Sequence, residues 1–478
     1  MLFNSYQFLI FFPVVTSCYF LLPHRSRWLM LLLASCLFYM AFIPTYIVIL
    51  ALLIVIDYNA GIWIERTEGP VRRTFLVMSI LATCVVLFVF KYFNFFIDNI
   101  TAVCDSLHWT CHKPALRLVL PIGLSFHTFQ SLSYVIEVYR KHQKAERNFG
   151  IYALYVMFYP QLVAGPIERP QNLLHQFYEE HHFAGKRVLD GLRLMAWGLY
   201  KKVLVADTAA LIANAVFAKN SFGSGWEVLL GMYAFSFQIY ADFSGYSDIA
   251  RGAARVMGFE LMLNFRLPYF ATGPSDLWRR WHISLSSWLR DYLYISLGGN
   301  RQGRWRTYRN LLLTMVIGGL WHGAAWTYVI WGAYHGLLLA GERFMRELFP
   351  GLTKIPASPW AARLLRAVKI LVMFHLTSLG WLFFRAVSMR QATEMLKALA
   401  GPWPINWPVV YSYKELLLFI WLLAVVQIVQ FVRRDLDWVV TVTPRIKVAF
   451  AAIVCAQIMV VWSMIGTQPP APFIYFQF

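Results

Sequence analysis

Apolar runs alternate with short polar or basic stretches along the whole chain, and this alternation predicts a multi-pass membrane protein. The runs cover residues 8–22, 28–42, 45–64, 75–97, 118–138, 151–163, 192–217, 226–240, 310–340, 364–384, 416–432 and 448–464. A helix of about 20 apolar residues spans the hydrocarbon core of a bilayer. We therefore expect an all-α fold with about eleven membrane segments, give or take about two. A hairpin turned at Pro44 and a loop over residues 98–117 are part of this expectation.

Basic residues orient the predicted segments, because Lys and Arg concentrate in cytoplasmic loops. Arg25 and Arg27 follow the first run, and Arg433 and Arg434 follow the run that ends at residue 432. Both loops are therefore predicted to be cytoplasmic, which places the N-terminus and the C-terminus outside. The first run has no basic residue before it and no small-residue cleavage site after it, so we interpret it as a retained span and not as a signal peptide.

The first of two histidines with notable surroundings lies in a basic and aromatic stretch. On a helix, Arg279, His282, Ser286 and Arg290 would share one face, and Trp and Leu residues would form the other. This pattern predicts an amphipathic helix at the membrane surface, with an interfacial His282. An anchor for anionic headgroups explains the arginines as well as a binding site does, but it has no use for a titratable ring.

The second histidine, His322, lies in a run from 310 to 340 that holds no Lys, Arg, Asp or Glu. An ionisable residue in such a run is a functional candidate, although a structural histidine bonded to a neighbouring helix stays possible. Arg309 and Arg343, 34 residues apart, would be about 50 Å apart on one straight helix, against a hydrocarbon core of about 30 Å. The segment must tilt or break, and glycines 318, 319 and 323 offer the break. His322 beside it suits a general base or a proton relay.

Composition narrows the classes of function. The chain is 59% hydrophobic and 14% charged, which excludes an ordinary soluble domain. Its net charge of +19 lies in short clusters between apolar runs, so we expect no nucleic acid partner. The six cysteines show no metal-ligand spacing, and no metal site is expected. Cys104 and Cys111 share a predicted outer loop, where a disulfide and two free thiols are both open.

Two further polar features interrupt the apolar runs. Asp242 and Asp248 follow the run that ends at residue 240, where helix caps are the favoured interpretation over a catalytic carboxylate pair. Lys201 and Lys202 lie inside the run over residues 192–217, so the depth of this run in the membrane is left open.

Four motifs make a family resemblance plain. They are Trp-Arg-Arg-Trp-His-Ile-Ser-Leu-Ser at 278–286, Trp-Leu-Arg-Asp-Tyr-Leu-Tyr-Ile at 288–295, Gly-Gly-Asn-Arg at 298–301 and Gly-Gly-Leu-Trp-His-Gly at 318–323. Together they resemble the membrane-bound O-acyltransferase superfamily, and most of all its bacterial branch that acetylates exported polysaccharide. The resemblance covers nearly the whole chain, and such a set of motifs is highly specific.

The resemblance implies one multi-pass domain over residues 1–478, with a catalytic core at 118–342 and an aromatic tail at 467–478. It implies a ring of tilted helices, some of them broken or re-entrant, around a central tunnel. In this family the histidine at the position of His322 is regarded as catalytic, and the one at the position of His282 as a second tunnel residue. Further tunnel candidates are Trp281, Trp321, Asp291 and Asn300.

The same resemblance implies acyl transfer at the bacterial inner membrane. We expect no bound cofactor, and acetyl-CoA or another acyl thioester as the co-substrate. Arg279, Arg280, Arg290 and Arg301 suit the phosphates of such a donor, although contact with lipid headgroups explains them almost as well. The expected acceptor is an exported polysaccharide such as alginate, with peptidoglycan, or a teichoic acid that receives D-alanine, as alternatives. A proton-coupled transporter is the rival of another class, but paired interrupted repeats are missing.

The aromatic C-terminus over residues 472–478 carries the last candidate. Aromatic rings favour the membrane interface, so this tail is either an anchor or a segment that folds back into an outer funnel. It also resembles a Phe-x-Tyr acyl-relay motif found on a companion protein of the related D-alanylation system. Tyr475 would then carry the acyl group to a partner, a separate exported transferase that modifies the polymer.

Overall fold

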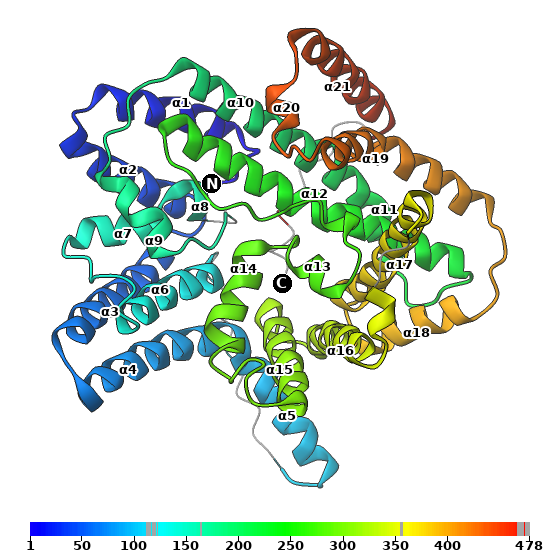
Figure 1. Ribbon diagram of the computed structural model, residues 1–478, viewed down its shortest axis with the longest axis horizontal. Coiled ribbons are helices and arrows are strands. Elements are labelled where there is room, and N and C mark those ends of the chain that lie inside the picture. Colours follow the sequence, from blue (N-terminus) through cyan, green and yellow to red (C-terminus); the bar gives the residue numbers. More distant parts are fainter. Residues whose placement is uncertain are drawn as a thin grey trace. The chain divides into compact units, whose positions relative to one another are not determined.

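The computed structural model describes residues 1–110, 116, 121, 123–162, 165–353, 357–465 and 473. Within these residues the secondary structure is helical, with no β-strand (Figure 1). They divide into two compact units. Unit 1 comprises Met1–Leu192 and Ile249–Met262, and unit 2 comprises Arg193–Asp248 and Leu263–Phe478.

Unit 1 holds the N-terminal helices. They are α1 (Tyr6–Leu21), α2 (His24–Met40), α3 (Tyr46–Arg66), α4 (Gly69–Leu87), η1 (Phe88–Tyr92), α5 (Phe93–Ser106), α6 (Leu124–Tyr139), α7 (Phe149–Met157), α8 (Tyr159–Leu162), α9 (Pro170–Leu173) and η2 (Leu174–Tyr178). The predicted hairpin at Pro44 is confirmed, since α2 and α3 flank it. The predicted loop from residue 98 is wrong at its start, because α5 continues to Ser106. Apolar residues at helical spacing, such as Ile100 and Val103, continue the helix there.

Helix α10 (Gly185–Leu199) has residues in both units, and so does α12 (Gly225–Met257). The other helices of unit 2 are η3 (Tyr200–Ala206), α11 (Asp207–Phe217), η4 (Pro268–Phe270), α13 (Pro274–Trp278), α14 (Ile283–Trp288), η5 (Leu289–Tyr294), α15 (Arg304–His322), α16 (Trp326–Leu348), η6 (Pro350–Thr353), α17 (Pro359–Arg385), α18 (Met389–Ala400), α19 (Trp407–Arg433), α20 (Trp438–Thr441) and α21 (Pro444–Ile465). The three C-terminal runs predicted from the sequence lie within α17, α19 and α21.

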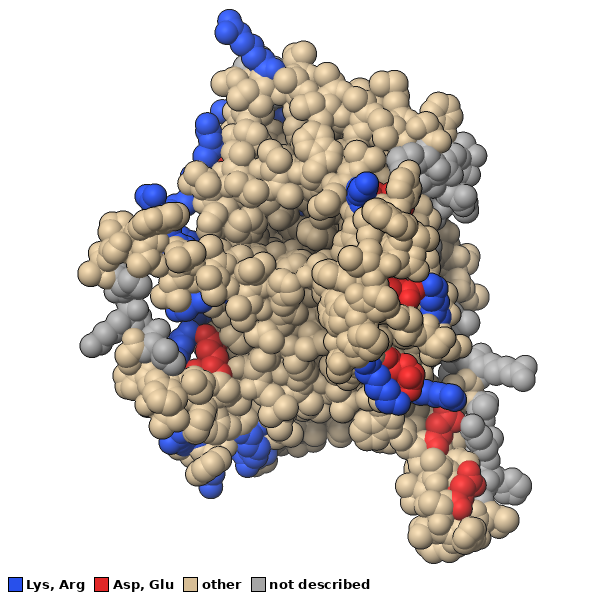
Figure 2. All heavy atoms as spheres, turned by 90° about the vertical axis from the view of Figure 1, so that its right-hand side faces the viewer, with Lys and Arg blue, Asp and Glu red and all other residues tan. Residues whose placement is uncertain are grey.

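Several segments have the length and composition of membrane spans. In the described part of the chain, the long ones are Tyr46–Arg66, Gly69–Ser106, Pro359–Arg385 and Trp407–Arg433, and Tyr6–Leu21 and Val448–Ser463 are shorter apolar helices. On the face drawn in Figure 2, uncharged residues cover a wide area, and charged side chains lie mainly toward its borders. The protein is therefore a multi-pass membrane protein, and the number of about eleven segments stays a prediction.

The break predicted in the run around His322 is confirmed. Helix α15 ends at His322, Gly323 is extended, and α16 begins at Trp326. The two helices pack closely as a hairpin, because small residues let their backbones meet. A Cβ atom added at Gly319 would lie 2.3 Å from the carbonyl oxygen of Tyr328, and one added at Gly332 would lie 2.3 Å from that of Met315. Gly319 therefore serves helix packing, and the break itself lies at Gly323.

The interpretation of Asp242 and Asp248 as helix caps is wrong, because α12 runs through both residues without interruption. Both carboxylates face lysines of η3, a π-helical segment that interrupts the run between α10 and α11. The Nζ atom of Lys201 lies 2.7 Å from Asp248, and that of Lys202 lies 2.9 Å from Asp242 and 2.7 Å from Asp207. Both lysines are buried, at 4% and 1% exposure.

The ion pairs of Lys201 and Lys202 explain why η3 is π-helical and not a regular α-helix. Consecutive residues of a regular α-helix point about 100° apart, so two neighbouring side chains rarely both face the interior. A π turn widens the helix locally and is frequent at functional sites. A buried ion pair needs both partners, since removal of one leaves an uncompensated charge in a medium that solvates it poorly. Lys201 and Lys202 therefore hold η3 and α12 together.

Replacement of the shared cation tests this arrangement. We expect Lys202→Met to destabilise the protein by about 3–5 kcal/mol, because Asp207 and Asp242 lose the lysine that both contact. Lys219→Met, which removes an exposed ion pair with Glu227, is the control and should cost no more than about 1 kcal/mol. Thermal unfolding of the detergent-purified variants measures both, and equal unfolding temperatures would contradict the ion-pair account.

Candidate active site

His322 is buried at the C-terminal end of α15, with 7% of its surface exposed. Aromatic rings surround it. The ring centroids of Trp321, Trp331 and Phe384 lie 4.9, 5.1 and 5.2 Å from that of His322, all in edge-to-face geometry. The helix ends directly after the histidine, so its ring lies where regular backbone gives way to the extended Gly323.

His282 is also buried, with 1% of its surface exposed, so the interfacial position predicted for it is wrong. The continuous amphipathic helix is wrong as well, because α13 ends at Trp278 and α14 begins only at Ile283. His282 lies between them with φ 42° and ψ 57°, in the left-handed region that non-glycine residues rarely adopt. Its ring meets Phe243 of α12 edge to face, at a centroid distance of 4.5 Å.

Asn264 holds this unusual backbone in place. It is completely buried, and its backbone oxygen accepts a hydrogen bond from the N–H of Ile283 at 2.9 Å. Its side-chain oxygen accepts bonds from the hydroxyl of Ser284 at 2.7 Å and from the N–H of Ser284 at 3.3 Å. Its amide nitrogen donates to Ser247 of α12 at 3.1 Å. The residue thus joins the turn at His282 to α12.

A continuous aromatic cluster connects the surroundings of the two histidines. Trp281 lies between α13 and α14, directly before His282. Its ring packs against that of Trp381 at a centroid distance of 4.8 Å. Trp381 stacks on Trp331 at 5.8 Å, and Trp331 contacts His322. Trp281 and Trp321, predicted as tunnel residues, are both buried, at 3% and 5% exposure. The cluster excludes water from most of the space around both imidazoles.

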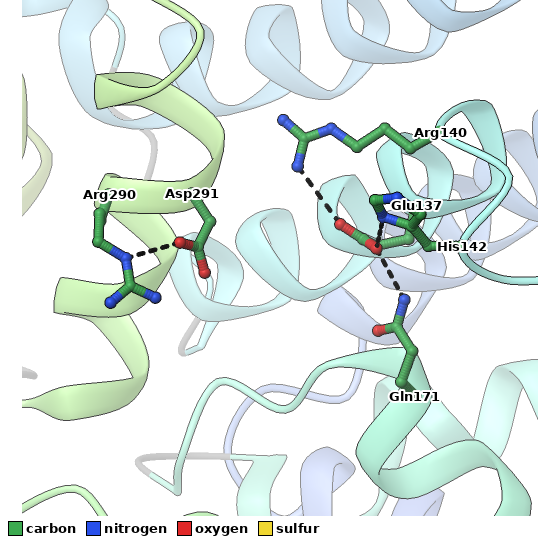
Figure 3. Close-up of polar contacts among 6 residues, drawn as sticks. All are labelled: Glu137, Arg140, His142, Gln171, Arg290 and Asp291. Atoms are coloured by element: carbon green, nitrogen blue, oxygen red, sulfur yellow. Dashed lines mark hydrogen bonds and ion pairs between the residues drawn. The ribbon is translucent and has the colours of Figure 1, made fainter. Parts of the chain in front are cut away.

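A cavity of about 500 Å³ opens beside this cluster within unit 2. Its wall is mostly apolar and includes Trp278, Ile283, Met315 and Leu339 together with Arg279 and Arg290. Arg290 also donates from Nε to Asp291 at 2.7 Å, as Figure 3 shows. The structure thus brings two of the four predicted arginines to one cavity. An apolar wall with two guanidinium groups suits a ligand that has an apolar arm and an anionic end.

The other predicted polar residues lie elsewhere. Arg280 is not part of the cavity wall. Its Nε is paired with Asp276 at 2.7 Å, and another guanidinium nitrogen donates to the backbone oxygen of Arg266 at 3.3 Å. Asn300 and Arg301 are exposed and are not part of the cavity wall. Any ligand contact by these three residues stays a prediction.

An ion-pair clasp joins the start of α15 to the end of α16. Glu347 accepts hydrogen bonds from Tyr308 and Arg343, both at 2.9 Å, and Arg304 lies 2.8 Å away. The hydrogen bond from Tyr308, with the bond from Arg343 and the charge of Arg304, holds the pKa of Glu347 below its usual range. The clasp fixes the open end of the hairpin whose other end carries His322.

Unit 1 carries a separate polar cluster around Glu137, near the end of α6 (Figure 3). Its carboxylate accepts a hydrogen bond from Gln171 at 2.8 Å and lies 3.1 Å from His142 and 3.5 Å from Arg140. Arg140 and His142 follow the end of α6, and Gln171 lies in α9. These contacts satisfy Glu137 without a ligand, so we assign it a structural role.

Two predictions, one for the loop after α5 and one for the C-terminal tail, fall partly outside the described residues. Cys104 is disulfide-bonded, whereas Cys111 lies outside the described residues, so their pairing stays a prediction. Tyr475 also lies outside them. Phe473 of the same tail is described, and it is completely buried against Tyr246 and Phe243, with ring centroids 4.2 and 5.9 Å apart.

The sequence interpretation missed two buried polar residues of unit 2, His335 and Asn264. His335 lies in the same charge-free run as His322, so the argument that singled out His322 applied to it as well. Asn264 left no such signal, because an asparagine in a loop is ordinary and its partners lie far away in the sequence.

Comparison with known proteins identifies the family of the chain. The model of the membrane-bound O-acyltransferase family matches residues 72–386. The chain is 41% identical over 413 residues to the probable alginate O-acetylase AlgI of Pseudomonas aeruginosa, covering 85% of this chain and 76% of the relative. It is 35% identical over 438 residues to the peptidoglycan O-acetyltransferase of Helicobacter pylori, covering 84% and 80%. It is 26% identical over 284 residues to the teichoic acid D-alanyltransferase of Bacillus subtilis, covering 57% and 70%.

The clamp around Asn264 can be tested without any activity. Asn264→Ala removes the side-chain bonds to Ser284 and Ser247, and we expect a loss of about 1–3 kcal/mol of stability. Hydrogen–deuterium exchange should rise most in the peptide that covers residues 279–288. Asn59→Ala, which removes a bond within one helix only, is the control. Unchanged exchange over the turn at His282 in Asn264→Ala would show that Asn264 does not hold it.

Proposed function

The chain belongs to the membrane-bound O-acyltransferase family, and we propose that it moves an acetyl group from a cytoplasmic thioester to an exported polysaccharide such as alginate. That it is a multi-pass membrane O-acyltransferase follows from the family. The specific acceptor and donor are the proposal. The observation that carries the chemistry is the buried His322 at the break between α15 and α16.

The family decides between the two classes of function that the sequence left open, since it is an enzyme family and not a transporter family. Among acceptors, alginate has the strongest support. The relatives named for alginate are 39–42% identical to this chain, the peptidoglycan relative is 35% identical and covers a similar share, and the teichoic acid relatives are 26–29% identical over little more than half of the chain. Acetylation of peptidoglycan is the second candidate on this basis.

His322 is proposed as the general base of the transfer. The imidazole accepts the proton of the attacking hydroxyl while that oxygen bonds to the carbonyl carbon of the thioester. The carbon–sulfur bond then breaks, and the leaving thiolate takes the proton back from the imidazolium. The aromatic rings around His322 limit the access of water, which would otherwise hydrolyse the thioester.

The donor is proposed to reach His322 from the cavity beside Trp278. Arg279 and Arg290 in its wall match the phosphates of coenzyme A, and the apolar remainder matches the arm that carries the thioester. His282 is proposed as a second residue of the tunnel, close to the same aromatic cluster. A ring of about eleven segments around this tunnel, with both termini outside, completes the proposed arrangement.

The transfer is proposed to end on a separate exported transferase through Tyr475. The support comes from the same tail, since Phe473 is buried against α12, the helix that also contacts His282. Tyr475, two residues further along the chain, is proposed to supply the phenolic hydroxyl that a base activates. This relay would explain how a membrane-embedded chain serves a polymer outside the membrane.

Removal of the proposed base should abolish the reaction. We expect His322→Ala to lower transfer from labelled acetyl-CoA at least about 100-fold, in line with the usual contribution of general base catalysis. Its yield and unfolding temperature should stay close to the parent's. His175→Ala, at an exposed histidine, is the control. Parental activity of the purified His322→Ala protein would remove this residue from the mechanism.

Replacement of Tyr475 by phenylalanine tests the proposed acyl relay. Tyr475→Phe keeps the ring and any anchoring role but removes the nucleophile, so we expect acetylation of the polymer in cells to be lost while the protein still inserts. Tyr411→Phe, at an exposed tyrosine of α19, provides the matched control. Polymer acetylation at the parental level in Tyr475→Phe would leave the tail as an anchor.

A further inference from the structure

A third histidine lies in the core of unit 2, and no step proposed so far uses it. His335 of α16 is buried, with 1% of its surface exposed. The rings of Trp331, Trp278 and Tyr334 enclose it at centroid distances of 5.0, 5.2 and 5.3 Å. In the described part of the chain, neither of its ring nitrogens has a hydrogen-bond partner.

Such a group needs an explanation, because a buried polar atom without a partner costs about 1–3 kcal/mol. The indole nitrogens of Trp278 and Trp331 beside it are also without partners in the described structure. Each indole can only donate, whereas a neutral imidazole donates from one nitrogen and accepts at the other. The three side chains together therefore offer N–H donors and one acceptor nitrogen. This combination matches a secondary amide, whose carbonyl oxygen accepts and whose N–H donates.

The position of His335 on α16 indicates which part of a ligand it could contact. Trp331, His335 and Leu339 are four residues apart and share one face of α16. Trp331 contacts His322, and Leu339 lines the cavity that Trp278, Arg279 and Arg290 also line. His335 therefore lies between the arginines of the cavity and the proposed base.

Space for the imidazole is provided by a glycine of the neighbouring helix. A Cβ atom at Gly380 of α17 would lie 2.7 Å from Nε2 of His335. Any larger residue there would push against the ring. The fold thus keeps a buried, polar ring in a place where an apolar side chain would leave no ring nitrogen without a hydrogen bond.

We propose that His335 binds the acyl donor by hydrogen bonding to an amide of its thiol arm. The donor class is an acyl thioester whose arm carries secondary amides, as a pantetheine arm does. Arg279 and Arg290 hold the anionic end, His335 holds the arm, and the thioester reaches His322. The proposal rests on the acyl transfer proposed above and adds a residue that distinguishes one thioester from another.

The test compares two donors in the full-length, detergent-purified protein. His335→Phe keeps a planar aromatic ring, slightly larger than imidazole, and removes both nitrogens. We expect its KM for acetyl-CoA to rise about tenfold, which corresponds to about 1.4 kcal/mol of lost binding. Its KM for S-acetyl-mercaptoethanol, a thioester without amides, should not change. His335→Gln, which can donate and accept, should recover most of the affinity for acetyl-CoA.

Tyr334→Phe is the matched control, because it removes a hydrogen bond from the adjacent residue of α16, to the backbone oxygen of Leu376. It should leave both KM values at those of the parent. Equal KM values for His335→Phe and the parent would overturn the proposal. So would an equal loss with both donors, since that outcome assigns His335 to packing around His322.

Further outcomes separate a failure of folding, a failure of the proposed function and a failure of the role of His335. If His335→Phe fails to fold, His335→Leu replaces it, and the same difference between the two donors is required. If the parent protein transfers acetyl from neither thioester, the proposed function itself fails. If the parent is active and only the donor discrimination is missing, the role of His335 alone is refuted.

Discussion

Irregular backbone inside a membrane protein has to be covered by protein, because the bilayer core offers no hydrogen-bond partners. The break between α15 and α16 is covered in this way. A Cβ atom at Gly323 would lie 2.1 Å from the ring of Tyr328, so the turn is closed by an aromatic side chain of the next helix. The clasp at Glu347 fixes the other end of the hairpin. His322 owes its buried position to this arrangement.

The same principle governs the turn at His282. Its left-handed backbone would be strained alone, and the hydrogen bonds that Ile283 and Ser284 donate to Asn264 hold it. Asn264 is linked in turn to α12, and the ion pairs of Lys201 and Lys202 fix α12 against η3. Buried polar contacts therefore position His282, whereas aromatic rings surround His322 and limit the access of water. The two kinds of interaction have separate tasks.

The sequence predicted those features that depend on local pattern. The helical fold, the hairpin at Pro44 and the break beside His322 all follow from apolar length and glycine content. What it could not predict depends on distant partners. Periodicity placed His282 on a surface helix, because nothing near it reveals the hydrogen bonds from Asn264. The aspartates of α12 resembled caps for the same reason, since their lysines lie about 40 residues earlier.

An active site for acyl transfer has to combine two requirements that oppose each other. The reaction needs polar groups that move a proton and bind the donor, and it needs little water, which would compete as a nucleophile. Unsatisfied polar atoms in a dry site are costly unless a substrate completes them. His335 fits both requirements. Its ring nitrogens have no hydrogen-bond partner in the described residues, and the ring lies between the cavity that contains the arginines and the ring of His322. The donor would then supply the hydrogen bonds that the fold leaves open, so that binding the correct thioester relieves a cost that a shorter thioester cannot.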